Sequence, residues 1–200
     1  MFYMTPVWTT IFEIIFLKKK HGWQRILSLS LALGGLWVVF GQGGKIPLPI
    51  NAGDWIALLG GVMFAGGMIR LEVIKTDGVF PIIFGFFFYG TLFNIVAGIL
   101  LVDYLGPVPT RDAFVGMTTF LILLSIFYFI PTGIVILWAP TQIGAGICSI
   151  LFLSEIIVGA VSSSILTDEP FGWRQVTGCS LIVIGGIVAV VLSPKENVSK

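Results

Sequence analysis

Charged residues are scarce in this sequence, and their scarcity excludes a water-soluble domain. Only 10% of the 200 residues are Asp, Glu, Lys or Arg, whereas 56% are apolar, and the mean hydropathy is +1.03. Soluble domains carry about 25% charged residues, so this chain lacks the polar side chains that would cover its surface in water. The composition therefore predicts a protein that lies in a lipid bilayer.

Histidine and cysteine are scarcer still, which limits metal and cofactor chemistry. The single histidine, His21, lies in a polar segment, and Cys148 and Cys179 each lie inside an apolar run with no Cys or His partner nearby. Metal sites need clusters of such ligands at short spacing, so we expect no metal, no cofactor and no disulfide. A net charge of +1 also offers no basic surface for nucleic acid.

What the sequence has in abundance is apolar runs, and they predict about seven transmembrane helices. A span takes about 20 apolar residues, and the runs show no period-two alternation, which favours helices over a β-barrel. The fold class we expect is an all-α polytopic membrane protein, with a sharp corner at 139–142. The expected helices are 2–17, 24–41, 54–72, 79–102, 113–139, 142–166 and 173–192.

Lysine and arginine residues predict the orientation, because cytoplasmic loops are enriched in them. With seven spans, one side receives eight of these residues and the other receives three: Lys45, Arg111 and Arg174. We therefore expect the basic loop at Lys18–Lys20 and the C-terminus to be cytoplasmic, in the cell (plasma) membrane.

Two segments of the chain are similar at an offset of 150 positions. Residues 3–41 align over 153–191 without a gap, and Gly22-Trp23 meets Gly172-Trp173. The alternation of loops puts one hinge inside and the other outside, so the two copies are expected to be inverted. Inverted repeats are typical of many secondary transporters.

Several motifs resemble those of the EamA-type permeases of the drug/metabolite transporter superfamily. They are Tyr3-Met-Thr-Pro6-Val-Trp8, Gly53-Asp54-Trp55, and Leu153-Ser154-Glu155 followed by Glu169-Pro170 and Trp173. The resemblance implies ten helices in two inverted five-helix repeats, with both termini cytoplasmic. The sequence departs from the family pattern at Ile156, where proline often follows the glutamate, and at Lys18-Lys19, where the first repeat often has Gly-Glu.

That template also implies a domain organisation for the chain. Residues 1–41 correspond to the last two helices of the first repeat, 42–53 to an external loop, and 54–192 to the complete second repeat, followed by a cytoplasmic tail at 193–200. We therefore expect one whole repeat plus the end of another, in a chain lacking the first three helices of the family plan. A homodimer is one way in which the missing half can be supplied.

Glu155 is the foremost candidate site residue. It lies about 18 Å into the expected helix 142–166 at 1.5 Å per residue, near the middle of the bilayer, where a carboxylate costs on the order of 3 kcal/mol. With Ser154 beside it, Glu155 is expected to bind a cationic group or to take up a proton. The alternative is a protonated glutamate whose hydrogen bond fixes helix packing.

Further polar and aromatic residues are candidates for the lining of a substrate path. We expect Asn94, Tyr128 and Trp8 to line it, although an amide also joins helices and aromatic residues also mark membrane interfaces. Glu13 is expected to reach the interface beside the basic loop. Pro131 is expected to kink its helix.

The function predicted is a permease that moves a small organic solute by alternating access, with the lipid bilayer as its other partner. The alternative is a membrane scaffold or inactive fragment that transports nothing. A membrane enzyme is disfavoured, because the loops lack the clusters of His and Asp that metal or phosphate chemistry requires.

Overall fold

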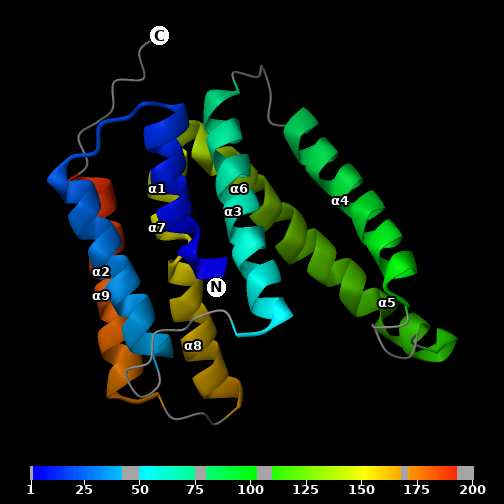
Figure 1. Cartoon of the computed structure of the whole chain (residues 1–200). Coiled ribbons are helices and arrows are strands. Elements are labelled where there is room, and N and C mark those ends of the chain that lie inside the picture. Colours follow the sequence, from blue (N-terminus) through cyan, green and yellow to red (C-terminus); the bar gives the residue numbers. More distant parts are fainter. Residues whose placement is uncertain (1, 42–49, 75–79, 103–109, 168–170, 193–200) are drawn as a thin grey trace. The chain divides into compact units, whose positions relative to one another are not determined.

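The structure is a computed structural model that describes residues 2–41, 50–74, 80–102, 110–167 and 171–192. Every regular element in these ranges is helical (Figure 1). The chain divides into two compact units, residues 1–73 together with 140–200, and residues 74–139. The predicted tail at 193–200, most of the predicted loop at 42–53, and Glu169 lie outside the described residues.

The described helices have the lengths and surfaces of membrane spans. Many large apolar side chains are exposed, such as Phe93 at 72% and Leu166 at 81%, whereas Thr9, Glu13 and Arg25 are buried. Apolar groups outside and charged groups inside are stable only in a bilayer, so the chain is a multi-pass helical membrane protein. Among the described residues, six stretches are long and apolar enough to span, and Phe2–Phe16 is a shorter apolar helix. The six are Trp23–Phe40, Ala52–Val73, Phe80–Leu100, Arg111–Ile143, Ala145–Leu166 and Trp173–Val191.

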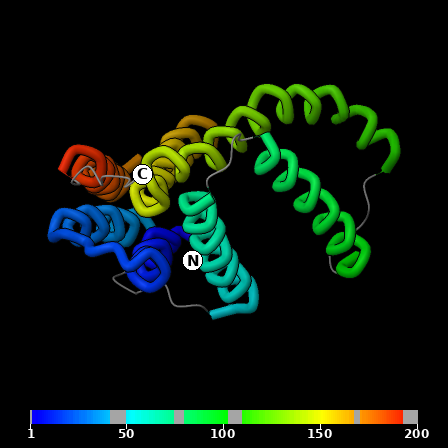
Figure 2. Tube along the Cα trace, turned by 90° about the horizontal axis from the view of Figure 1, so that it is seen from above, coloured from blue at the N-terminus to red at the C-terminus, as the bar shows by residue number. Residues whose placement is uncertain are grey.

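The first unit is a bundle in which α2 (Trp23–Phe40) lies along α9 (Trp173–Val191), as both views show (Figures 1 and 2). Beside this pair, α1 (Thr5–Phe16), which follows a short 3₁₀ turn at Phe2–Met4, packs against α3 (Ala52–Val73) and α7 (Ala145–Leu151). The remaining helix, α8 (Ser154–Leu166), follows α7 after a short break and also contacts α9.

Small residues allow the backbones of α2 and α9 to touch. A Cβ atom on Gly35 would lie 2.5 Å from the carbonyl oxygen of Gly178, and one on Gly185 would lie 3.0 Å from that of Ser28. The Ser28 hydroxyl donates a hydrogen bond of 2.7 Å to the Gly185 carbonyl. Close backbone approach of this kind is a main source of helix association in membranes.

The α2–α9 contact is reciprocal at the offset of 150 positions. A Cβ on Gly35 would meet Gly178 and Ile182, and a Cβ on Gly185 would meet Ser28 and Ala32. Each residue of one set lies 150 positions from its counterpart in the other, so the same contact occurs twice with the two helices exchanged. The helix bounds agree as well: α1 and α8 end at 16 and 166, and α2 and α9 begin at 23 and 173. The two helices run antiparallel, because residue numbers rise on α2 as they fall on the facing part of α9.

The second unit contains α4 (Phe80–Leu100), α5 (Arg111–Leu124), a π-helical turn at Ser125–Phe129, and α6 (Ile130–Ile143) as far as Ala139. Pro131 has no N–H to donate to the preceding turn. The chain responds with a wider turn, in which the Ile130 N–H bonds to the Ser125 carbonyl. A π-helical turn therefore lies directly before Pro131, the position at which a kink is predicted.

Two predicted boundaries are wrong. The corner expected at 139–142 does not form, because α6 continues through Pro140 to Ile143 and the chain turns at Gly144. Gly144 has a φ of 83°, a conformation that is easily accessible only to glycine. The predicted helix 142–166 is also divided into α7 and α8, with Phe152 and Leu153 as a turn between them.

The α2–α9 contact predicts a difference between two adjacent glycines. Gly35→Ala is expected to destabilise the protein by about 1–3 kcal/mol, because the added methyl group overpacks the contact. Gly34→Ala is the matched control, since a Cβ there meets nothing within 4 Å and alanine favours helix. Thermal unfolding in detergent measures both variants, and equal midpoints would contradict the close contact.

Candidate functional site

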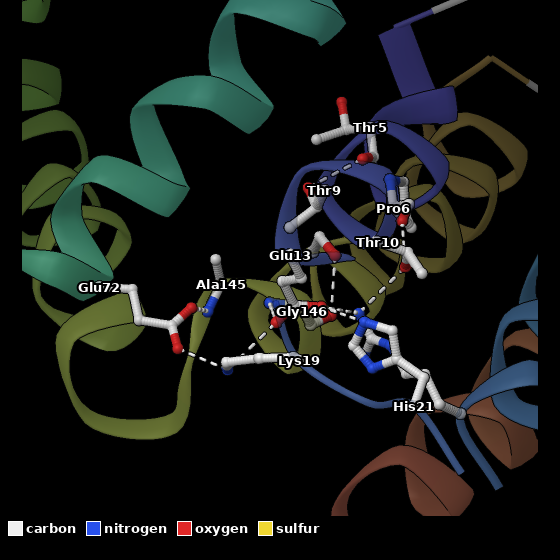
Figure 3. A network of polar contacts seen from close by, with 12 residues as sticks. Thr5, Pro6, Thr9, Thr10, Glu13, Lys19, His21, Glu72, Ala145 and Gly146 are labelled. Atoms are coloured by element: carbon white, nitrogen blue, oxygen red, sulfur yellow. Dashed lines mark hydrogen bonds and ion pairs between the residues drawn. The ribbon is translucent and has the colours of Figure 1, made fainter. Parts of the chain in front are cut away.

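A cluster of charged side chains is buried at one end of the first unit (Figure 3). We call it the Glu13 cluster; it consists of Glu13, Lys19, His21, Arg25 and Glu72. The side chain of Glu13 is 5% exposed and that of Arg25 is 8% exposed. The residues come from α1, the following loop, α2 and α3, so the cluster joins four parts of the bundle.

The basic loop reaches Glu13 because the chain folds back over the end of α1. Lys18 adopts a left-handed conformation with φ of 52°, a common way to end a helix. The N–H of Lys19 then bonds to the Glu13 carbonyl at 3.2 Å. This turn directs the side chain of Lys19 toward the carboxylate instead of the surrounding solvent.

The two carboxylates of the cluster face two cations. Lys19 Nζ lies 2.6 Å from Glu72 Oε1 and 3.4 Å from Glu13 Oε1, so the ammonium group bridges both acids (Figure 3). Arg25 lies 3.3 Å from the other Glu13 oxygen and donates to the Thr10 hydroxyl at 3.3 Å. His21 Nε2 is 3.5 Å from Glu13 Oε2.

Backbone N–H groups at the start of α7 complete the cluster. The Gly146 N–H donates to Glu13 Oε1 at 3.2 Å, and the Ala145 N–H donates to Glu72 Oε2 at 2.9 Å. Residue 146 has no room for a side chain, because a Cβ would collide with both Glu13 and Arg25. The turn at Gly144 therefore places two backbone donors directly on the two acids.

Glu13 lies beside the basic loop, as predicted, but its side chain is not exposed there. Its carboxylate points inward and is almost fully buried. A buried charge is tolerated only when partners replace its hydration, and Glu13 has Lys19, Arg25 and the N–H of Gly146. One signal in the sequence points to this arrangement: Lys19 and Arg25 lie on either side of Gly22-Trp23 and can both reach Glu13.

Glu155 lies on a groove in the same unit. It is in the first turn of α8, where the helix dipole favours a negative charge, and the carboxylate has no hydrogen bond or ion pair within the described residues. The groove has a volume of about 380 Å³. It is lined by Tyr3, Val39, Phe40, Glu155, Ile156, Gly159, Ala160, Ser163, Ser164, Phe171 and Gln175.

The break between α7 and α8 determines where Glu155 lies. The N–H groups of Leu153, Glu155 and Ile156 each bond to the carbonyl three residues earlier, which is the tighter 3₁₀ pattern. Interrupted helices of this kind often mark binding sites in transporters. The interruption forms without a proline, since Ile156 follows Glu155.

Neither Ser154 nor Trp8, the other predicted lining residues in this unit, lines the groove at Glu155. Ser154 is exposed and lines a different, largely apolar hollow along α9. Trp8 is half-buried, and its Nε1 has no hydrogen-bond partner in the part of the chain that the structure describes. Asn94 and Tyr128 belong to the second unit and are exposed, and the Asn94 amide bonds to the Gly90 carbonyl of its own helix.

Within the described ranges, no group of His, Cys, Asp and Glu side chains could hold a metal ion. Cys148 and Cys179 are free and buried. The sequence matches no protein-family model, and comparisons with curated proteins and with solved structures find no match either.

The crowding at Gly146 predicts a strong effect of one methyl group. Gly146→Ala is expected to destabilise the protein by about 1–3 kcal/mol, because the added Cβ must displace Glu13 and Arg25. Gly67→Ala in α3 is the control, since nothing lies within 4 Å of that position. Thermal unfolding in detergent compares the two, and an unchanged midpoint for Gly146→Ala would show that the cluster is looser than described.

Proposed function

We propose that this protein is a membrane permease that moves a small organic solute by alternating access, as the resemblance to EamA-type permeases implies. The observation that carries the proposal is the groove at Glu155. A single carboxylate lies there among apolar and hydroxyl side chains, next to an interruption of a spanning helix. Solute sites typically combine an apolar lining with a few polar groups.

The reciprocal packing of α2 and α9 supports an inverted repeat. Helices related by a two-fold axis perpendicular to their length run antiparallel, and the paired contacts of Gly35 and Gly185 follow that relation. If both helices span the bilayer, such an axis lies in the membrane plane, as in transporters with inverted repeats. We propose that α1 with α2, and α8 with α9, are the two inverted segments.

In this proposal Glu155 binds a positively charged or hydrogen-bond-donating part of the solute. Glu155→Gln is expected to lower saturable uptake into proteoliposomes about tenfold, because a hydrogen bond to a charged partner contributes about 1.5–3 kcal/mol. A panel of amines, amino acids, nucleosides and sugars is first screened for solutes that stabilise the wild-type protein and enter the vesicles.

The control is Asp112→Asn, which removes an exposed carboxylate at the start of α5. It should leave uptake unchanged, and both variants should insert in equal amounts. Equal uptake by wild type and Glu155→Gln would remove Glu155 from the site. A panel in which nothing binds or crosses would favour the scaffold alternative.

The proposed orientation places the C-terminus and the basic loop in the cytoplasm of the cell whose plasma membrane holds the protein. In a bacterial host, a fluorescent protein fused after Lys200 is expected to fluoresce, and alkaline phosphatase fused there to be inactive. Phosphatase fused after Asn51 should be active. The reverse pattern would invert the assignment without changing the fold.

A further inference from the structure

The groove and the Glu13 cluster occupy equivalent places in the two similar segments. Five lining residues of the groove each lie 150 positions after a residue of the Glu13 cluster or its surroundings. The pairs are Thr9 with Gly159, Thr10 with Ala160, Glu13 with Ser163, His21 with Phe171, and Arg25 with Gln175.

The two equivalent places differ in whether they are open. On the groove side, Gly159 is exposed and about 380 Å³ is unfilled. On the cluster side, Thr9 is fully buried and its hydroxyl donates a hydrogen bond of 2.9 Å to the Thr5 carbonyl. There the space is closed by Glu13 and Arg25, with the backbone of Gly146 against them.

We propose that the Glu13 cluster is a closed gate, and that the structure is the state of the permease in which the groove at Glu155 is open to the opposite side. This inference rests on the proposed function. Two similar segments in opposite orientations can exchange their conformations, so the open and the closed end can change places. Opening the gate separates Glu13 and Glu72 from the start of α7 and admits water beside Thr9.

Ion pairs are suited to such a gate because they stabilise the closed state only while it is dry. Buried and complete, the cluster replaces the lost hydration of its charges, and once water enters the same charges are solvated instead. The net preference between the two states is therefore small compared with each individual interaction. A small population shift then suffices to switch the gate.

Reporter cysteines at equivalent positions test the gate. In a background with Cys148→Ala and Cys179→Ala, Thr9→Cys reports on the cluster side and Gly159→Cys on the groove side. Each is treated in membranes open on both sides with a membrane-impermeant cationic methanethiosulfonate. Without further change, Gly159→Cys should react rapidly and Thr9→Cys should be protected.

Removing the central ion pair should reverse this pattern. In the double variant Glu13→Gln with Arg25→Gln, labelling at position 9 is expected to rise about tenfold and labelling at 159 to fall. The double variant is used because it removes both members of one buried ion pair together. Lys20→Gln, a loss of one exposed charge in the same loop, should change neither rate.

Reciprocal change at the two positions supports the gate. Three results would overturn the proposal. Protection of position 9 in every variant would show that the cluster never opens, and faster labelling at both positions would show general loosening. No labelling at position 159 would show that water does not enter the groove. The labelling needs no solute, so failure of the gate and failure of transport are distinguished. If labelling is reversed but no solute is taken up, the gate is supported and the proposed transport function is not.

Discussion

The buried charge of Glu13 is the constraint on which the first unit depends. Its oxygens accept from Lys19, Arg25 and the Gly146 N–H, which come from the loop, α2 and α7. An uncompensated carboxylate in a bilayer costs several kcal/mol, so α1 cannot keep its position unless the other three elements keep theirs. The left-handed turns at Lys18 and Gly144 follow from the same requirement, since each directs a donor toward an acid.

The glycine contact between α2 and α9 complements the cluster. The close backbone contacts at Gly35 and Gly185 hold α2 and α9 together. The Glu13 cluster and the groove at Glu155, which differ in polarity, lie away from these contacts. The groove and the cluster differ in side-chain size and charge, although α1 and α8 end, and α2 and α9 begin, at equivalent positions.

Much of the fold could be predicted from the sequence because apolar runs and helix-ending residues are local signals. The start of α9 at Trp173 was predicted to the residue and that of α2 at Trp23 within one, since a glycine precedes each apolar run. The turn at Gly144 was assigned instead to Pro140, because proline is the more familiar helix breaker. The burial of Glu13 could not be predicted, because its backbone donor Gly146 lies 133 positions away. No local sequence pattern indicates a partner at that distance.

That separation has a consequence for how the protein is made. Glu13, Lys19 and Arg25 are made together with α1 and α2, but the N–H of Gly146 leaves the ribosome on the order of ten seconds later. The Ser28 hydroxyl waits longer still for the carbonyl of Gly185, 157 positions away. During this interval Glu13 already has two cationic partners, Lys19 and Arg25, within the same helical hairpin. The segment from α1 to α2 thus contains two charged partners of Glu13 before α9 is made and packs against α2.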